Sequence, residues 1–148
     1  MGNWWSSPQT VSTFVRRPAV PNRTADVAFL RWLQAIDRTT SKTEWGRKTW
    51  DHLHARAIQW RHGKNSLEAA KEREYLTRLF ASLPCGECRG HALTYYSTHR
   101  LDLQTSLSYQ IWMYEFQNSV NARLGKPHFS WQEYEETYLT ERLRANHV

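Results

Sequence analysis

Cys85 and Cys88 form a Cys-Gly-Glu-Cys motif, and the 148-residue chain has no other cysteine. Two sulfurs three residues apart on one helical turn can close a disulfide, so the pair can cycle between dithiol and disulfide. Pro84 precedes the pair and suits the first turn of a helix, where unpaired N–H groups and the helix dipole stabilise a thiolate. The motif therefore predicts thiol–disulfide exchange.

Three other interpretations of this motif stay open on the residues alone. Thioredoxin-like proteins carry it after a strand, whereas the preceding segment 72–84 has a helical pattern. A zinc site with Cys85, Cys88 and His91 lacks a second cysteine pair and needs a distant histidine, so no metal is expected. The two thiols can also be inert and buried as small apolar side chains.

Composition restricts the class of protein. Hydrophobic residues make up 40% and charged residues 23%, as in an ordinary domain that can bury a core. No stretch approaches the roughly 18 consecutive apolar residues of a membrane helix, and the N-terminus has no secretory pattern. The net charge of +6 permits an anionic partner, but Lys and Arg are scattered among acids rather than gathered in a stripe. No nucleic acid is therefore expected as a partner.

The apolar spacing is helical almost throughout, and no alternating run predicts a sheet. Serine or asparagine followed three residues later by glutamate indicates three of the helix starts, and Gly125 with Pro127 indicates a helix end. This pattern predicts an all-α bundle. The expected helices are 26–37, Ser41 to about 61, Asn65 to about 83, 84–98, 106–124, and Ser130 to about 144.

Three segments carry a resemblance to a known family. They are WGRKTWDHLH (45–54), LFASLPCGECRGHA (79–92) and WMYEFQNSVNARLGKPHF (112–129). In this order and at these separations they resemble the Erv/ALR family of FAD-linked sulfhydryl oxidases over about residues 44–135. The likeness is greatest to the short, iridovirus-like versions carried by large cytoplasmic DNA viruses. It rests on three motifs in order rather than on CxxC alone.

The resemblance implies a four-helix bundle with a short fifth helix, FAD at the bundle mouth and usually a homodimer. The expected domain is 41–148, preceded by a mostly flexible arm, 1–40, that includes a short helix. In the family the second cysteine lies against the flavin, which assigns Cys88 to that place. The first cysteine receives electrons from substrate thiols, which assigns Cys85.

The resemblance also implies a set of residues that bind FAD. Trp50 and His54 lie four residues apart and project from one helical face, although the residues alone also permit a plain core. Asn118, Asn121 and Lys126 are equally typical of a solvated polar helix face. The implied set is Arg47, Trp50, His54, Cys88, Asn118, Asn121 and Lys126.

Three departures from the family pattern matter. Gln117 stands where the family has histidine, so its expected contact with adenine or ribose is in doubt. Tyr114 and Trp131 stand where cellular relatives have a structural disulfide, and burial of two aromatic rings can replace that cross-link. Without a third or fourth cysteine there is no shuttle disulfide. Cys85 and Cys88 must therefore take electrons directly from a partner.

The expected function is an FAD-dependent thiol oxidase that forms disulfides in partner proteins and passes electrons to O2, giving H2O2. The expected partners are a thiol-containing redox carrier or viral substrate proteins. The expected place is the host cytoplasm or the virus assembly site, including the virion. Gly2 fits a myristoylation pattern, so membrane association is expected only if it is acylated. The alternative is a basic helical nucleic-acid-binding protein with structural zinc or inert thiols.

Overall fold

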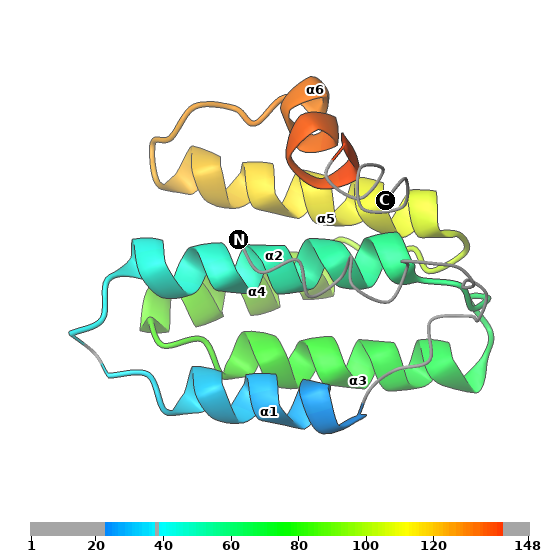
Figure 1. The fold of residues 1–148 in the computed structure, drawn as a ribbon, viewed down its shortest axis with the longest axis horizontal. Coiled ribbons are helices and arrows are strands. Elements are labelled where there is room, and N and C mark those ends of the chain that lie inside the picture. Colours follow the sequence, from blue (N-terminus) through cyan, green and yellow to red (C-terminus); the bar gives the residue numbers. More distant parts are fainter. Residues whose placement is uncertain (1–22, 38, 141–148) are drawn as a thin grey trace.

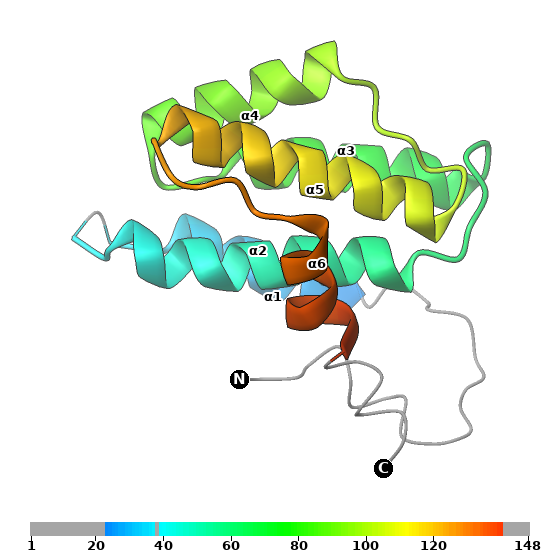
Figure 2. The same ribbon diagram turned by 90° about the horizontal axis from the view of Figure 1, so that it is seen from above.

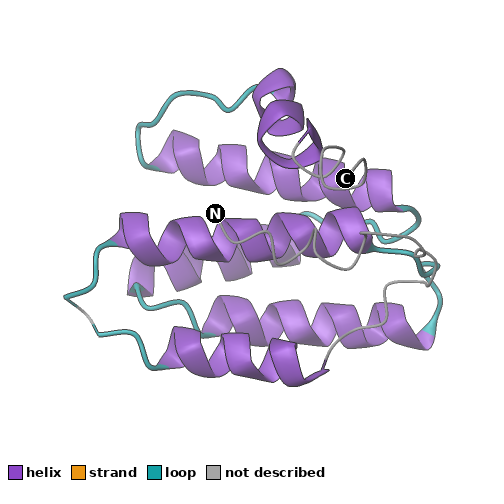
Figure 3. Ribbon diagram, in the orientation of Figure 1, coloured by secondary structure: helices purple, strands orange, loops and turns teal. Residues whose placement is uncertain are grey.

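The computed structural model describes residues 23–37 and 39–140, and throughout these residues the regular structure is helical, with no strand (Figure 3). Predictions for Gly2 and for the chain beyond residue 140 lie outside the described residues. The all-α prediction is confirmed. The elements are α1 (Arg23–Gln34), α2 (Lys42–Gln59), α3 (Leu67–Ala81), α4 (Gly86–Thr98), α5 (Ser106–Arg123) and α6 (Trp131–Tyr134), followed by a π-helical turn at Glu135–Leu139.

Side-chain caps fix where the helices begin, because each satisfies a backbone N–H that the first turn leaves unpaired. Ser41 and Ser130 cap α2 and α6 as predicted, and Gly125 has the left-handed φ of 71° expected after α5. The prediction for α3 was wrong by one residue, since Ser66 rather than Asn65 accepts the capping bond. Pro84 was also misplaced: it precedes α4 and lies outside its first turn.

The core lies between α2, α3, α4 and α5, which run alternately along one long axis (Figures 1 and 2). The α3–α4 connection brings the end of one helix back to the start of the next, so the Cys-Gly-Glu-Cys segment lies at one end of the bundle. The start of α2 and the end of α5 lie at this same end in both views. Fully buried core side chains include Leu53, Leu76, Leu79, Phe80, Tyr109 and Met113.

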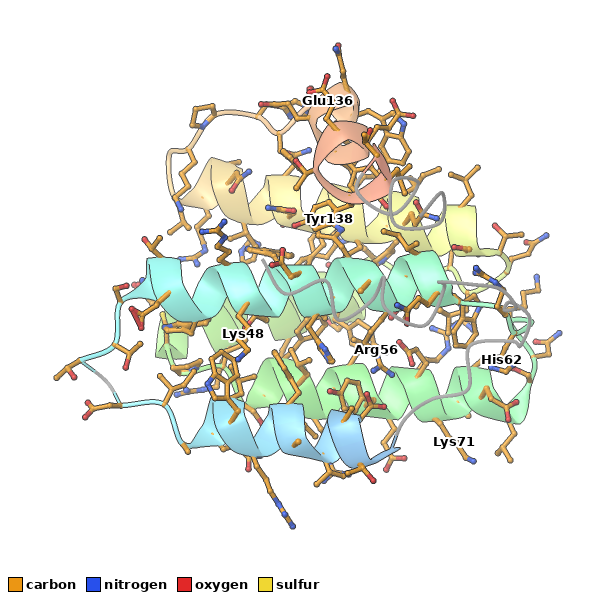
Figure 4. All side chains as sticks on the ribbon, in the orientation of Figure 1. Lys48, Arg56, His62, Lys71, Glu136 and Tyr138 are labelled. Atoms are coloured by element: carbon orange, nitrogen blue, oxygen red, sulfur yellow. The ribbon has the colours of Figure 1, made fainter. Side chains whose placement is uncertain are left out.

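Helix α1 packs along α2 and α3 on the side opposite α6 (Figure 1). Its Leu33 is 1% exposed and belongs to the same hydrophobic cluster as the bundle. Buried Arg56 of α2 pairs with Asp26 of α1 and with Glu72 of α3, each at 2.6 Å (Figure 4). Removing one member of such a group leaves an uncompensated charge. Within the predicted arm 1–40, α1 is therefore part of the packed domain.

An aromatic cluster fixes the C-terminal segment to α5. The rings of Tyr114 and Trp131 meet edge to face with centroids 5.1 Å apart, and both pack with Tyr134. Asn118 holds the intervening loop, because its amide donates to the Phe129 carbonyl at 2.9 Å and accepts from the Phe129 N–H at 2.8 Å. The two rings that stand where cellular relatives have a disulfide are therefore in contact, each of them half-buried, and their replacement of that cross-link stays a prediction.

We expect Trp131→Ala to lower the free energy of unfolding by about 2 kcal/mol, because it removes ring packing between α6 and α5. Urea denaturation measures this change. Leu67→Ala is the control, since Leu67 is 67% exposed and its loss should cost no more than about 0.5 kcal/mol. Equal changes in the two variants would show that the aromatic pair does not replace the cross-link.

Candidate active site

Cys85 occupies the N-cap position of α4. Its backbone is extended, with φ −105° and ψ 128°, and its Sγ accepts from the Cys88 N–H at 3.2 Å. Helix α3 has ended before Pro84, and a proline disfavours helical backbone in the residue before it. The chain is therefore extended here, and α4 begins after Cys85. Both cysteines are free thiols and both are half-buried. The pair is thus held close together at a helix end that partners can reach.

The two thiols differ in acidity. Burial raises the pKa of Cys85, but hydrogen bonds from the Cys88 thiol and N–H, together with the charge of Lys42, outweigh it and bring the pKa below its ordinary value. Burial raises the pKa of Cys88, and its hydrogen bond to Cys85 and the charge of that neighbour raise it further. Of the two, Cys85 is therefore the thiol that ionises first, and it is the better leaving group in disulfide exchange.

His54 is a fully buried polar group at the centre of a second cluster. Its Nε2 donates to the side-chain carbonyl of Gln117 at 2.6 Å, which leaves Nδ1 as an acceptor. Among the described residues Nδ1 has no hydrogen-bond partner. The imidazole packs on the ring of Tyr138 at 4.4 Å, and Tyr134 lies at 5.4 Å. An unpaired buried acceptor among flat rings is a feature that a planar ligand would satisfy.

Trp50 joins the two clusters. Its ring lies 5.9 Å from His54 and 5.3 Å from Phe116. Phe116 in turn stacks on His91, with centroids 6.3 Å apart, and His91 follows Cys88 by three residues on α4. Trp50 and Cys88 both pack against the main hydrophobic cluster. The structure therefore brings the predicted residues of α2 and α4 into one connected region.

The remaining predicted residues lie in different surroundings. Arg47 and Lys126 are exposed, Arg47 on α2 and Lys126 in the loop after α5. The Asn121 carbonyl accepts from the Lys126 N–H at 2.8 Å, so this backbone contact ends the helix. Asn118 uses its amide on the loop backbone, as described above, and Gln117 binds His54. The assignment of all seven residues of the predicted set to FAD, including Trp50, His54 and Cys88, stays a prediction.

Two residues of this region, Tyr138 and Tyr134, were not identified from the sequence as candidates for the site. Tyr138 packs on His54, and its hydroxyl donates to Asp51 of α2 at 3.4 Å, where the turn after α6 approaches α2 (Figure 4). Tyr134 lies one turn earlier and its hydroxyl donates to Gln110 at 2.6 Å. The available signal was their spacing of four residues, which places both rings on one helix face.

The burial of His54 predicts a pH-dependent stability. Burial lowers the pKa of His54 to about 4, from an ordinary 6.5. The unfolded chain therefore binds a proton between these values that the folded chain does not, so His54 contributes a fall of about 3 kcal/mol in the free energy of unfolding as pH falls through this window. Burial also lowers the pKa of His52, which adds to the slope in the same direction, so the difference between wild type and a His54 variant isolates the His54 part. Urea denaturation of the apoprotein from pH 7 to pH 4 measures the slope. The same slope in His54→Gln would contradict this origin.

Comparison with known protein families matches residues 47–139 to the Erv1 / Alr family. The all-helical fold, with its cysteine pair at the start of α4, agrees with this match. The chain belongs to the Erv1/Alr family, as the resemblance implied.

Individual relatives agree with this assignment. The FAD-linked sulfhydryl oxidase of African swine fever virus is 38% identical over 101 residues, covering 68% of this chain and 85% of that protein. A protein of Invertebrate iridescent virus 3 is 36% identical over 89 residues, covering 56% of this chain and 57% of that protein. The FAD-linked sulfhydryl oxidase ERV1 of Arabidopsis thaliana is 24% identical over 129 residues, with 82% and 68% covered.

Two further findings concern other classes of site. Within residues 23–37 and 39–140, no three His, Cys, Asp or Glu side chains gather closely enough to hold a metal ion. None of the helices in the described part of the chain has the length and apolarity needed to cross a membrane.

Proposed function

We propose that Cys85 and Cys88 relay electrons from the thiols of a partner protein to FAD in this FAD-dependent thiol oxidase. The observation that carries the proposal is the position of the pair at the start of α4, with the lower pKa on Cys85, in a region that the Trp50, Phe116 and His91 rings connect to His54. Family membership favours this function over a nucleic-acid-binding protein with inert thiols. When bound, FAD supplies a two-electron acceptor that returns its electrons to O2, giving H2O2.

The residues present fit a flavin nucleotide. The unpaired Nδ1 of His54 offers an acceptor inside a buried region, and Trp50 and Tyr138 offer flat rings close to that histidine. The exposed cations Arg47 and Lys126 suit a diphosphate, whose charge can remain near solvent. These residues would hold the cofactor, and the apolar packing around Trp50 would exclude water from it.

The relay follows from the chemistry of the two thiols. A partner thiolate attacks Sγ of Cys85 in the oxidised pair; the Cys85–Cys88 bond breaks, and Cys88 leaves as a thiolate. A second partner thiolate then attacks the partner sulfur of the mixed disulfide and releases Cys85, whose lowered pKa favours its departure. The partner has lost two electrons and two protons, and the cysteine pair holds the two electrons.

The proposal extends to the protein's partner, its location in the infected cell and its oligomeric state. The partner is a thiol-containing redox carrier or a viral substrate protein, and the place is the host cytoplasm or a virus assembly site. Similarity to proteins of African swine fever virus and an iridescent virus supports both. We also propose that the protein forms a homodimer, which light scattering of the purified protein tests. Membrane association would require an acylated Gly2, which mass spectrometry tests.

A trapping experiment tests the direct partner. In Cys88→Ser, the Cys85 thiolate can attack the disulfide of an oxidised carrier, and no neighbouring thiol resolves the product. We expect a mixed disulfide with one dedicated thiol carrier, several-fold above the level in Cys85→Ser. Recovery of abundant unrelated proteins at equal levels in both variants would contradict a dedicated partner.

A further inference from the structure

The end of the bundle that carries Cys85 and Cys88 is surrounded by exposed basic side chains from three helices. Lys42 is the first residue of α2, Arg89 follows Cys88 on α4, and Arg123 is the last residue of α5. Figures 1 and 2 both place these three helix ends at one end of the molecule. We call these three residues, Lys42, Arg89 and Arg123, the cationic rim.

Two contacts and one electrostatic effect link the members of the rim to the cysteine segment. Arg123 Nη2 lies 3.9 Å from Cys88 Sγ. Arg89 Nη1 donates to the Leu83 carbonyl at 2.6 Å, which holds its guanidinium beside the residues that precede α4. The charge of Lys42 bears on the pKa of both cysteines and lowers each. The three cations thus lie at the end of the bundle that carries the reacting sulfurs (Figures 1 and 2), and Arg123 is in contact with one of them.

Two carboxylates offset part of the charge of these three cations. Glu44 and Glu87 are the acidic residues in the first turns of α2 and α4, and both side chains are exposed. The helix dipole of α4 adds a further partial positive charge where the cysteines lie. A thiol group that approaches Cys85 therefore enters a positive field, which attracts anions and repels cations.

We propose that the cationic rim selects a partner whose reactive dithiol is flanked by acidic groups. This rests on the proposed function, in which partner thiols attack Cys85. The selectivity arises at two points. Carboxylates near the partner's thiols raise its local concentration at the rim, and the rim stabilises the negative charge of the attacking partner thiolate. The exchange itself is the one described above, with two electrons passing from the partner's thiols to the cysteine pair.

Two small dithiols test the selectivity, because dihydrolipoate and dihydrolipoamide share the same dithiol and differ by one carboxylate. We expect kcat/KM, per bound flavin, to be about two- to fivefold higher for dihydrolipoate at low salt, and the ratio to approach one at high salt. In Lys42→Glu the ratio should fall to one or below. That variant should fold, since an acidic residue suits the first turn of a helix.

Lys71→Glu is the matched control, because Lys71 is exposed at the opposite end of α3 (Figure 4) and should keep the wild-type ratio. A second variant, Arg89→Gln, should also lower the ratio. A wild-type ratio of one at low salt, or equal ratios in wild type and Lys42→Glu, would overturn the acidic partner while leaving the relay intact. Turnover retained by Cys85→Ser would instead overturn the relay, so the two failures are distinguishable.

Discussion

Serine in place of either Cys85 or Cys88 is expected to reduce oxidation of a small dithiol by at least about a thousandfold, while FAD stays bound. The reason is that each thiol is an obligatory carrier, and losing one member of a set that acts as a unit removes nearly all of the rate. The described cofactor-binding candidates, His54 and Trp50, lie on another helix and are unchanged. Oxygen consumption with dithiothreitol, normalised to flavin absorbance, measures the effect.

The two variants should differ in their spectra. Cys85→Ser keeps the thiol next to Arg123 without its partner, so the Cys88 pKa should fall once the neighbouring sulfur is gone. If that thiolate faces the flavin, this variant shows a long-wavelength charge-transfer band that Cys88→Ser lacks. The reverse pattern would exchange the two assigned roles. Retained oxygen consumption in either variant would contradict the relay itself.

Trp50→Ala and His54→Ala are expected to lose flavin and stability together. FAD that binds only the folded chain stabilises it by about 4 kcal/mol at a thousandfold excess over its Kd, so a variant that no longer binds loses that contribution. Truncating the partly buried Trp50 ring also removes its packing on Phe116, at a cost of about 3 kcal/mol. Thermal unfolding and released flavin, measured on the same samples, follow both losses.

A control separates cofactor loss from core damage. Lys71→Ala removes an exposed side chain of α3 and should change neither flavin content nor Tm by much. Adding excess FAD should raise the Tm of wild type and of Lys71→Ala but not that of His54→Ala. If the His54→Ala protein binds FAD normally, His54 is an ordinary buried histidine with no role in binding the cofactor.

Local rules predicted most of the helices because caps and apolar spacing are local signals. Ser41, Ser130 and Gly125 gave correct boundaries, since each satisfies or ends a helix through its own backbone geometry. The start of α3 was missed by one residue because Asn65 and Ser66 are both good caps and only tertiary packing chooses between them. The same reasoning left the packing of α1 unpredicted, because its pairing with Arg56 joins residues 30 positions apart.

The site was predicted less completely than the fold. Spacing on α2 correctly brought Trp50 and His54 together, because residues four apart share a helix face. The partners from other elements, Gln117 and Tyr138, depend on how α5 and the turn after α6 meet α2, which no local pattern contains. Asn118 shows the converse difficulty, since its amide suits a ligand and a loop backbone equally well.

The central claim is that electrons reach FAD only through Cys85 and Cys88. Anaerobic addition of dithiothreitol to the purified yellow protein, followed by flavin absorbance, tests it most directly. The account predicts rapid loss of the flavin's visible absorbance in wild type and recovery on admitting O2, with one H2O2 formed per disulfide. Cys85→Ser and Cys88→Ser should keep their absorbance over the same time. Equally rapid bleaching in either serine variant would contradict the account.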